Sequence, residues 1–495
     1  MVMAWELLFM FSPFIVVVAG LIGERVKIAK LREIVAIAMS AFSVYSVYNL
    51  YNMVQATQDK ILIVTLGGAP PLGACLEIDM LSIYMAFSAT LLGLFATVYS
   101  YSYMEHDTRL TEYYTLLSAL VASIVGVSFA GDFFTFFVFW EMMGISSYVL
   151  VAFRKENWGP IEAGFKYMVM GAIGSTLLLL GISLIYGMAG TVNFAQVSMA
   201  LKHEPLGIWL SLALIIFIVG FGVKSAIVPM HTWLPDAHPE APSPISAMLS
   251  GILIETALYG LTRVLNIAFE PSAFQMSIAI LAVLTMCLAN LLALLQQDIK
   301  RMLAYSSIAQ MGYMLIGLST GSLYGLQGLF LHVFNHSLLK GLAFLSAGSM
   351  VHVANTRDIQ GLKGIGRGMP ITTLTLFISF LGLGGVPTTN GFISKYLLFS
   401  SAVGAGLWWL TVIGVLNSAF SMAYYLRVMK TLVSKPVDAV KGLKEAPALM
   451  LAVTVAMATL IILFGVWPEP TAYYANEAAK SLVTNLNRYI GVIMG

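Results

Sequence analysis

Lys224 is a charged residue inside an apolar segment. The segment starts at Ile208, and Pro229 follows the lysine by five residues. A charge at membrane depth is costly, so a lysine there usually serves ion or proton movement. Proline lacks an N–H and crowds the carbonyl four residues earlier, here that of Ser225, which predicts a broken helix with a free acceptor beside Lys224. The alternative is that Lys224 extends its ammonium to the membrane surface.

Lys395 has the same kind of setting in the second half of the chain. It follows Pro387 and the pair Asn390-Gly391, and three glycines come shortly before the proline. These residues predict a second broken helix with a buried lysine. Broken helices beside buried charges, present in both halves of a chain, are typical of transporters.

Two carboxylates lie near the middle of apolar segments. Glu141 is nine residues after Asp132 and thirteen before Arg154, which places it near mid-bilayer at about 1.5 Å per helical residue. Glu255 is midway through its own segment. A buried carboxyl without a partner is neutral, whereas a nearby lysine keeps it charged, and Lys224 is the expected partner of Glu141. The alternative for both acids is a protonated carboxyl bonded to another helix.

His332, His336 and Lys340 are spaced by four residues within one apolar segment. Residues four apart on a helix differ by about 40° and about 6 Å, so the three side chains share one face. Histidine titrates near neutral pH, so this stripe predicts a proton path. The alternative is metal or haem ligation by the two histidines. A haem normally takes ligands from both sides of its plane, and no second membrane-embedded segment carries histidines to face these.

The composition is that of an integral membrane protein with many helices. Of 495 residues, 59% are hydrophobic and 10% are charged, against about 25% charged in soluble domains. A net charge of +2 without long basic runs gives no indication of nucleic-acid binding. The two cysteines, Cys75 and Cys287, are too few for an iron–sulfur cluster or a cysteine-based zinc site. We therefore expect no cofactor and no metal in this chain.

Apolar segments of about 20 residues predict the membrane-spanning helices that position these groups. We expect fourteen, at 4–23, 33–53, 78–103, 112–130, 132–152, 166–188, 207–229, 243–265, 274–296, 302–320, 323–350, 371–402, 404–430 and 447–467. The longest two, 323–350 and 371–402, have room for a kink or a break. The first segment lacks a basic region and a cleavage signal and is expected to be retained. A short polar tail is expected after Trp467, and no soluble domain.

Positive charges are distributed unevenly between the two sides of this arrangement. With the N-terminus outside and alternating helices, the inner loops hold 18 of the 26 Lys and Arg residues, and the outer side holds 5. The other three, at 224, 340 and 395, lie within helices. Membrane proteins carry their excess of Lys and Arg on the cytoplasmic side. We therefore predict a multi-pass protein of the cell membrane with its N-terminus outside.

Four stretches resemble a known family, the antiporter-like subunits of membrane complexes. They are the segment around Lys224 with Trp233-Leu-Pro-Asp-Ala-His-Pro-Glu-Ala-Pro-Ser-Pro, the run Asp298-Ile-Lys-Arg-Met-Leu-Ala-Tyr-Ser-Ser-Ile-Ala-Gln-Met-Gly-Tyr313, the segment His332 to Lys340, and Gly391-Phe-Ile-Ser-Lys395. The family includes the M- and N-type subunits of proton-pumping NADH:quinone oxidoreductase (complex I), the D-type subunits of Mrp sodium/proton antiporters, and the corresponding subunit of membrane-bound hydrogenases. The resemblance covers nearly the whole chain.

The resemblance implies an all-α membrane fold of fourteen helices with two inverted five-helix repeats. The repeats would comprise helices four to eight and nine to thirteen, with helices seven and twelve broken. The corresponding parts of this chain are 1–111 for helices one to three, 112–265 and 266–435 for the two repeats, and 436–495 for helix fourteen and the tail.

The resemblance also implies roles for the buried groups. The Glu–Lys pair of helices five and seven corresponds to Glu141 and Lys224, the connecting groups to the stripe His332, His336 and Lys340, and the terminal group to Lys395. A lysine at this terminal position resembles the N and D types, whereas the M type typically has a glutamate. Many members carry a lysine on helix eight where this chain has Glu255. The acid would make the central link a cation site or a carboxyl proton carrier, or would weaken proton transfer.

From these residues and the resemblance we predict an ion-translocating subunit of a multisubunit complex. The ion is the proton, with sodium as the alternative, for which Asp132, Glu141 or Glu255 would supply oxygen ligands. The expected partners are the lipid bilayer and other membrane subunits of an Mrp-like or complex I-like assembly. One alternative is the pump arm of a redox-driven complex (hydrogenase, sulfur reductase or NADH:quinone oxidoreductase) rather than a stand-alone cation/proton antiporter. Others are a structural or assembly subunit without transport, and a haem-bearing cytochrome.

Overall fold

The computed structural model describes residues 5–28, 30–68, 73–201 and 204–494, which are almost entirely helical. In these ranges 11 helices are long and apolar enough to cross a membrane, which confirms a multi-pass helical membrane protein. They are the short turn η1 with α2 (Leu8–Val26), α3 (Leu31–Ala56), α4 (Met80–Tyr103), α5 (Leu110–Phe129), α6 (Phe133–Val151), α7 (Trp158–Ala189), α11 with α12 (Ser243–Ala268), α13 (Gln275–Leu295), α15 (Leu323–Ala354), α18 (Trp408–Val433) and α19 (Ala448–Val466).

Shorter or more polar elements complete the described chain. A π-helical turn, Leu249–Leu253, joins α11 (Ser243–Met248) to α12 (Ile254–Ala268). The remaining elements named below are β1 (Leu62–Leu66), β2 (Ala74–Ile78), α8 (Phe194–Leu201), α9 (Ile208–Lys224), α10 (Leu234–Glu240), α14 (Ile299–Ser319), α16 (Pro370–Gly384), α17 (Asn390–Gly404) and α20 (Glu469–Met494).

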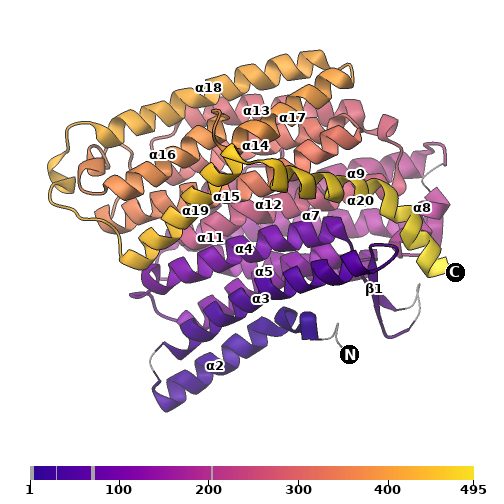
Figure 1. Cartoon of the computed structure of the whole chain (residues 1–495), viewed down its shortest axis with the longest axis horizontal. Helices are drawn as coiled ribbons and strands as arrows, with labels where there is room; N and C mark the ends of the chain where they lie inside the picture. Colours follow the sequence, from indigo (N-terminus) through magenta and orange to yellow (C-terminus); the bar gives the residue numbers. More distant parts are fainter. Residues whose placement is uncertain (1–4, 29, 69–72, 202–203, 495) are drawn as a thin grey trace.

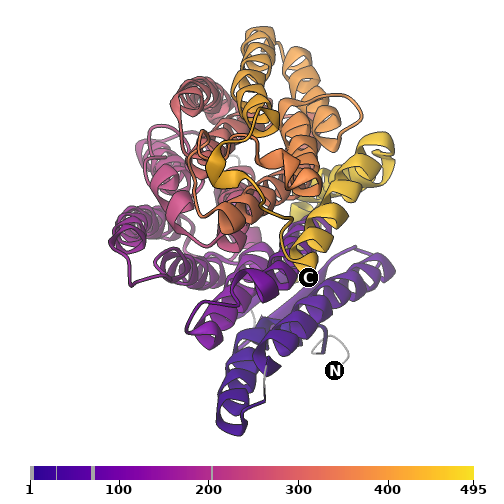
Figure 2. The ribbon, with the colours of Figure 1, turned by 90° about the vertical axis from the view of Figure 1, so that its left-hand side faces the viewer.

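The long helices run in nearly the same direction and lie side by side, with α2 and α3 at one edge of the bundle and α18 at the other (Figure 1). Figure 2 shows the same order of layers from the end of the bundle. Between these edges lies α15, which packs against α14, α16, α17, α19 and α20. The stripe of histidines and lysine on α15 is therefore enclosed by other helices.

Both predicted helix breaks are present, and backbone of positive φ marks each. The first half-helix, α9, ends at Lys224, and Ala226 has φ +54°. The helix thus ends before Pro229, whereas the predicted span 207–229 extended to this proline. In the second break, Thr388 has φ +76°, between α16 and α17. Positive φ is strained for residues other than glycine and for β-branched residues most of all, and such strain is common at functional sites.

One predicted irregularity is missing, and one helix start differs. No break divides α15, which runs from residue 323 to 354 as one helix. This segment contains no proline, so its ladder of hydrogen bonds is uninterrupted. The helix predicted to start at residue 166 starts at Trp158, because Pro160 fits the first turn, where no N–H donor is needed.

A β-hairpin, the short helix α8 and a C-terminal helix were not predicted. The antiparallel hairpin of β1 and β2 pairs Leu62 with Ile78. The residues after Trp467, predicted as a short polar tail, form α20 instead. One face of this helix is buried, at Ala475, Ala478, Ala479 and Leu482, and it packs on α15 and α4 (Figure 1). Spacings of three and four apolar residues are typical of an amphipathic helix, which hydropathy alone does not detect.

Candidate functional site

Lys224 is the last residue of α9 and is buried. Its Nζ donates a hydrogen bond to the Tyr148 hydroxyl at 3.2 Å and lies 4.5 Å from the centre of that ring. The ring centres of Tyr167 and Trp140 are at 5.2 and 5.8 Å. Aromatic faces attract cations, and the carbonyl end of a helix does the same. The site thus stabilises an ammonium without a carboxylate in contact.

Glu141, the expected partner of Lys224, is not in contact with it. No ion pair within 4.0 Å joins these two described residues, although the carboxylate acts on the ammonium electrostatically. The ammonium lies instead against α6 at Gly144, where an added Cβ would be 3.1 Å from Nζ. Glu141 is one turn earlier on the same helix and only partly buried. Glu141 therefore acts on the Lys224 ammonium from a distance, and Tyr148 is the residue that contacts it.

Glu255 and His336 form a direct pair. Glu255 follows the π-helical turn of the α11–α12 segment, and both side chains are 0% exposed. One carboxylate oxygen, Oε1, contacts Nδ1 of His336. The other oxygen and the second ring nitrogen of His336 have no hydrogen-bond partner among the described residues. Each group therefore has a free position at which a proton or a water molecule can bind.

His332 connects this pair to the second broken helix. Its ring is stacked on that of His336, with centres 5.9 Å apart. His332 Nδ1 and the Ser394 hydroxyl are 2.9 Å apart, and Nε2 is 3.1 Å from Gln310 Oε1. Gln310 Nε2 in turn donates to the carbonyl of Leu383 at 3.1 Å. Both ring nitrogens of His332 are thus occupied by neutral polar partners.

Lys395 completes this line of contacts. Its Nζ donates to the same Leu383 carbonyl at 2.5 Å and to the Ser418 hydroxyl at 2.9 Å. The ammonium is 4.6 Å from the ring centre of Tyr313. The carbonyl belongs to the last turn of α16, whose negative end favours a cation. A cavity of about 440 Å³ between α16, α17 and α18 borders Lys395.

Lys340 lies further along α15 and is bound differently from the two histidines. Its Nζ donates to the Leu303 carbonyl at 3.0 Å and to the Ser306 hydroxyl at 2.7 Å, both on α14. Ser306 also contacts the Tyr425 hydroxyl. Lys340 therefore faces α14 and α18, whereas His336 faces α12.

The structure brings some of the predicted groups together and separates others. Hydrogen-bond or ring contacts run without interruption from Glu255 to Lys395. Among the described residues, no hydrogen bond joins Lys224 to Glu255. The rings of Phe136 and Phe221 lie next to the α12 backbone at Gly260. The lysine site and the line from Glu255 to Lys395 are therefore not joined by a direct polar contact in the described residues.

Gln310, Tyr148 and Ser394 were missed by the sequence predictions. Each is a neutral residue in an apolar segment, so charge placement did not indicate it. Gln310 lies in the long motif that begins at Asp298, and Ser394 lies in the stretch Gly391-Phe-Ile-Ser-Lys395, so the resemblance offered an indication for both. In the described residues, no group of three or more His, Cys, Asp or Glu side chains is arranged to hold a metal ion.

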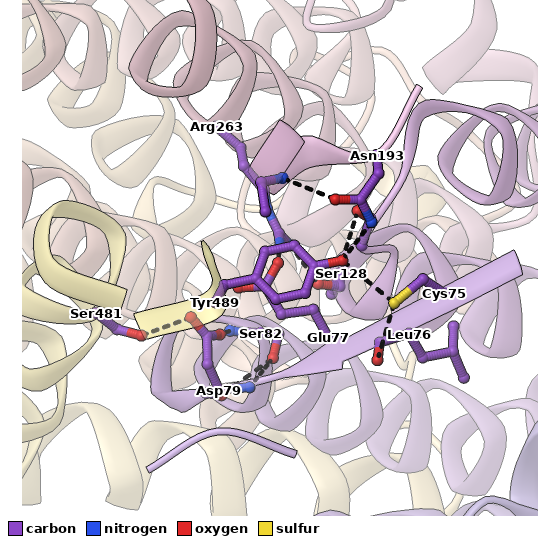
Figure 3. Close-up of polar contacts among 12 residues, drawn as sticks. Cys75, Leu76, Glu77, Asp79, Ser82, Ser128, Asn193, Arg263, Ser481 and Tyr489 are labelled. Atoms are coloured by element: carbon purple, nitrogen blue, oxygen red, sulfur yellow. Dashed lines mark hydrogen bonds and ion pairs between the residues drawn. The ribbon is translucent and has the colours of Figure 1, made fainter. Parts of the chain in front are cut away.

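A second buried polar cluster lies where the hairpin and α20 meet the bundle (Figure 3). Arg263 of α12 pairs with Glu77 of β2, and both are buried. Arg263 Nη1 also donates to the carbonyl of Ser128 at 3.1 Å. Arg263, one of the five residues counted on the outer side and within the predicted span 243–265, lies inside α12, where Glu77 compensates its charge. The pair connects the hairpin to the helix that carries Glu255.

Tyr489 ties α20 into the same cluster (Figure 3). Its hydroxyl donates to the carbonyl of Gly131 at 3.1 Å and accepts from Asn193 Nδ2 at 2.8 Å. The Cys75 sulfur is 3.2 Å away. Burial raises the pKa of the Cys75 thiol to about 11, so this thiol is neutral at physiological pH. The Ser481 hydroxyl donates to Asp79 at 2.6 Å, a second tie between α20 and the bundle.

Asp132 is used as a structural group. One carboxylate oxygen accepts the backbone N–H of Thr135 at 2.7 Å and so caps α6. The other accepts the N–H of Cys75 at 2.8 Å and the Thr135 hydroxyl at 2.7 Å. With both oxygens occupied, Asp132 is a poor candidate for the sodium ligand considered from the sequence.

A bundle of membrane-spanning helices with two broken helices and a line of buried ionisable groups defines a membrane protein of the transporter class. The chain belongs to the family of membrane subunits described as NADH:quinone oxidoreductase/Mrp antiporter, whose profile matches residues 130–421. Residues 70–114 match a second profile, the N-terminus of chain 5 of NADH-ubiquinone oxidoreductase (complex I).

Individual relatives agree with this assignment. Subunit N of the F(420)H(2) dehydrogenase of Methanosarcina mazei is 32% identical over 423 residues, 82% of this chain and 85% of that protein. A chain of the archaeal membrane-bound sulfane sulfur reductase superposes with a TM-score of 0.90 at 28% identity, with 99% of both chains covered. A chain of the Mrp complex of Dietzia shares the fold, with a TM-score of 0.89 at 22% identity and 99% coverage of both.

Proposed function

We propose that this chain is an ion-translocating subunit of a multisubunit membrane complex and that protons move along its buried line of ionisable groups. The observation that carries this proposal is the unbroken series of contacts from Glu255 through His336, His332 and Gln310 to Lys395. Buried groups of this kind are costly, and a series over five helices, which includes the Leu383 carbonyl of α16 between Gln310 and Lys395, has no packing purpose that apolar residues would not serve better.

The proposed mechanism is electrostatic. A charge a few ångströms away changes the proton affinity of a buried group strongly, because little solvent screens it. A proton that arrives at Glu255 would alter His336, and the change would pass through His332 to Lys395. Lys224, on the first broken helix, would supply protons to Glu255. The charge of Glu141 would change the proton affinity of Lys224 from a distance. No hydrogen bond joins Lys224 to Glu255 among the described residues, so this step requires water entry or side-chain rotation.

We also propose the number of membrane spans, the two repeats and the orientation of the chain in the membrane. Adding α14 and the two broken helices, α9–α10 and α16–α17, to the 11 long apolar helices gives fourteen spans. The two five-helix repeats would then be residues 112–265 and 266–435, preceded by 1–111 and followed by 436–495. With the N-terminus outside, the Lys- and Arg-rich loops lie in the cytoplasm, as expected for a protein of the cell membrane.

A second candidate function is the pump arm of a redox-driven complex. It is favoured by the relatives with the higher identity, a subunit of a dehydrogenase and a chain of a sulfur reductase. In that case other subunits would hold the redox centres and this chain would supply the ion path. The partners would be further membrane subunits. Gentle purification from the native membrane tests this, because co-purifying iron–sulfur or nickel–iron proteins identify a redox complex.

Transport assays with assembled variants test the ion path itself. We expect Lys224→Ala and Glu141→Ala to abolish proton movement in native membrane vesicles while the complex still co-purifies. Lys155→Ala, at an exposed loop position, is the matched control and should transport normally. Normal transport by both Lys224→Ala and Glu141→Ala would make this chain a structural or assembly subunit.

A further inference from the structure

Asn335 on α15 and Asn390 on α17 hold each other by two hydrogen bonds. Asn335 Nδ2 donates to the backbone carbonyl of Asn390 at 2.7 Å, and Asn390 Nδ2 donates to Asn335 Oδ1 at 3.1 Å. Each residue is 1% exposed. Both helices carry members of the buried line from Glu255 to Lys395, but the two asparagines are not among them. The pair is therefore a buried polar contact that the proposed proton path does not use.

The asparagine pair lies one helical turn from the contact between His332 and Ser394. His332 comes three residues before Asn335 on α15, and Ser394 comes four residues after Asn390 on α17. Residues three or four apart lie on the same face of a helix. The His332 Nδ1 and the Ser394 hydroxyl are 2.9 Å apart. The two contacts thus follow each other along one antiparallel interface, so a shift at the asparagine pair would also displace Ser394.

A close backbone contact continues the same interface on the other side of His332. Gly328 lies one turn before His332 on α15, and an added Cβ there would be 3.0 Å from the backbone nitrogen of Leu398 on α17. Glycine therefore lets the two backbones approach closely. The contact of His332 with Ser394 lies between this glycine contact and the asparagine pair. The two helices are thus held together on both sides of the imidazole.

The asparagine pair acts where the second broken helix resumes. Asn390 is the first residue of α17 and follows Thr388, whose φ is +76°. Thr389, in the N-cap position, makes no capping bond, because its hydroxyl donates to the Val386 carbonyl instead. The start of α17 therefore lacks the local side-chain cap that commonly fixes a helix start. The two bonds to Asn335 attach this start to α15.

The asparagines stabilise the interface less well than apolar residues would. Asn390 Oδ1 is buried and has no hydrogen-bond partner among the described residues. A buried acceptor without a partner destabilises the folded chain, whereas two apolar side chains would pack without this penalty. Hydrogen bonds are directional, so they fix the register of two helices more narrowly than apolar contacts do. The pair therefore suits a place where register matters.

We propose that Asn335 is a positioning residue, which fixes the start of α17 through Asn390 and so keeps the Ser394 hydroxyl in contact with the His332 imidazole. The inference rests on the proposed proton movement and adds to it the residue that holds the second broken helix in register. Ser394 holds Nδ1 of the ring while Nε2 faces Gln310. With Ser394 displaced, the ring can turn away from Gln310, which interrupts the line. Asn335 itself neither takes up nor releases a proton.

Substitutions of the two asparagines should differ in severity. Asn335→Leu removes both hydrogen bonds, and we expect the assembled complex to transport protons at least about tenfold more slowly than the wild type. Asn390→Leu leaves its backbone carbonyl as an acceptor for Asn335, so we expect a loss of only about two- to fivefold. Ser401→Ala is the matched control. Ser401 is also buried on α17, but its hydroxyl bonds to Leu398 of the same helix, so this variant should transport within about twofold of the wild type.

A double variant separates positioning from a general structural role. Ser394→Ala removes the contact that Asn335 is proposed to hold, and we expect a loss of transport similar to that of Asn335→Leu. If Asn335 acts through Ser394, the double variant should transport no more than about twofold below the slower single variant. In thermal unfolding, by contrast, it should be less stable than either single variant, because different hydrogen bonds are lost. A combined transport loss of about a hundredfold would mean independent effects and would contradict the proposal.

The assay uses the intact complex in native membrane vesicles, with a pH-gradient dye and either the redox substrate or a sodium pulse as the driving force. Co-purification of the other subunits establishes assembly for each variant. If Asn335→Leu does not assemble, Asn390→Leu takes its place in the comparison with Ser394→Ala. Transport at the wild-type rate by the asparagine variant or by Ser394→Ala would overturn the positioning role. A loss in Ser401→Ala as large as in the asparagine variant would do the same, because any lost polar contact on α17 would then suffice.

Lys395→Met distinguishes failure of this inference from failure of the proposed function. If Lys395→Met is inactive while Asn335→Leu transports normally, the positioning role alone fails. If both variants transport normally, the proposed proton movement along the buried line fails as well.

Discussion

The Glu255 carboxylate on α12 contacts the His336 imidazole on α15, and both are completely buried. This contact joins the first half of the chain to the second. It also gives Glu255, where the family resemblance predicts a lysine, a defined partner: the acid can accept a proton and return it to the imidazole.

The Glu255–His336 contact predicts that the carboxyl group must ionise. Glu255→Gln has nearly the same shape and can still bond to the ring, but it cannot take up a proton. We expect the variant to assemble and proton transport to fall by about a hundredfold. The dye assay in vesicles measures this. Glu255→Lys introduces the lysine that the family resemblance predicts, and if it were as active as the wild type, the sign of the charge at this position would not matter.

Tyr148 is the contacting partner of Lys224. A substitution of Tyr148 should therefore reduce proton transport less than a substitution of Lys224. Lys224→Arg keeps a cation among the aromatic rings but prevents proton release, and we expect transport to be lost. Tyr148→Phe removes one hydrogen bond but keeps the ring face, so we expect a decrease of only about two- to fivefold. Equal losses in the two variants would show that the hydroxyl itself carries the proton.

Gln310 links His332 to the Leu383 carbonyl, so its loss should affect both stability and transport. Gln310→Leu leaves the His332 Nε2 and the carbonyl with one partner fewer. We expect a destabilisation of about 1–3 kcal/mol. Transport should also fall, and Gln310→Glu should restore the acceptor to the imidazole. Thermal unfolding of the purified complex and the vesicle assay give the two readouts. A stable, fully active Gln310→Leu protein would exclude the amide from the proton line.

The Arg263–Glu77 pair predicts a structural role for the hairpin. Removal of one member of a buried ion pair costs about 3–5 kcal/mol, because the other charge is left unpaired. Arg263→Met should therefore lower the thermal stability strongly, and Arg263→Met combined with Glu77→Leu should recover most of it. The double-variant comparison is made by thermal unfolding. Equal instability of the single and double variants would mean that the other contacts of Arg263, such as that with Ser128, dominate.

Cys75 should react slowly with maleimides. Only the thiolate reacts, and a pKa of about 11 leaves little thiolate at pH 7. The labelling rate should rise by about tenfold per pH unit between pH 7 and pH 9, since the thiolate fraction rises in that proportion. A Cys287→Ser background makes the signal specific to Cys75. Tyr489→Ala should increase labelling by opening the cover that α20 provides; unchanged labelling would show that α20 does not protect the thiol.

The two breaks and the buried lysines could be predicted from the sequence, because glycine, proline and isolated charges stand out in apolar segments. Lys224 and Lys395 were found in this way. The partner of Glu255 could not be predicted, since His336 is 81 residues away and the contact depends on how α12 and α15 face each other. The direct Glu141–Lys224 contact was expected from complementary charge, but aromatic rings surround the ammonium instead.

The hairpin and α20 were missed for a different reason. Hydropathy over about 20 residues detects continuous apolar segments. The β-branched run before Gly67-Gly68 is only a few residues long, although such a run before two glycines is typical of a strand and turn. In α20 the apolar residues are interspersed with polar and charged ones, and Pro470 near its start is typical of a first helical turn.

Proton transport by the assembled complex with Lys395→Met tests the central claim most directly. Lys395 ends the line of contacts, and methionine has a similar length but carries no proton. If protons follow the buried line, this complex co-purifies normally and moves no protons above the background of vesicles without the complex. Transport at the wild-type rate by that complex would contradict a proton path along the buried line.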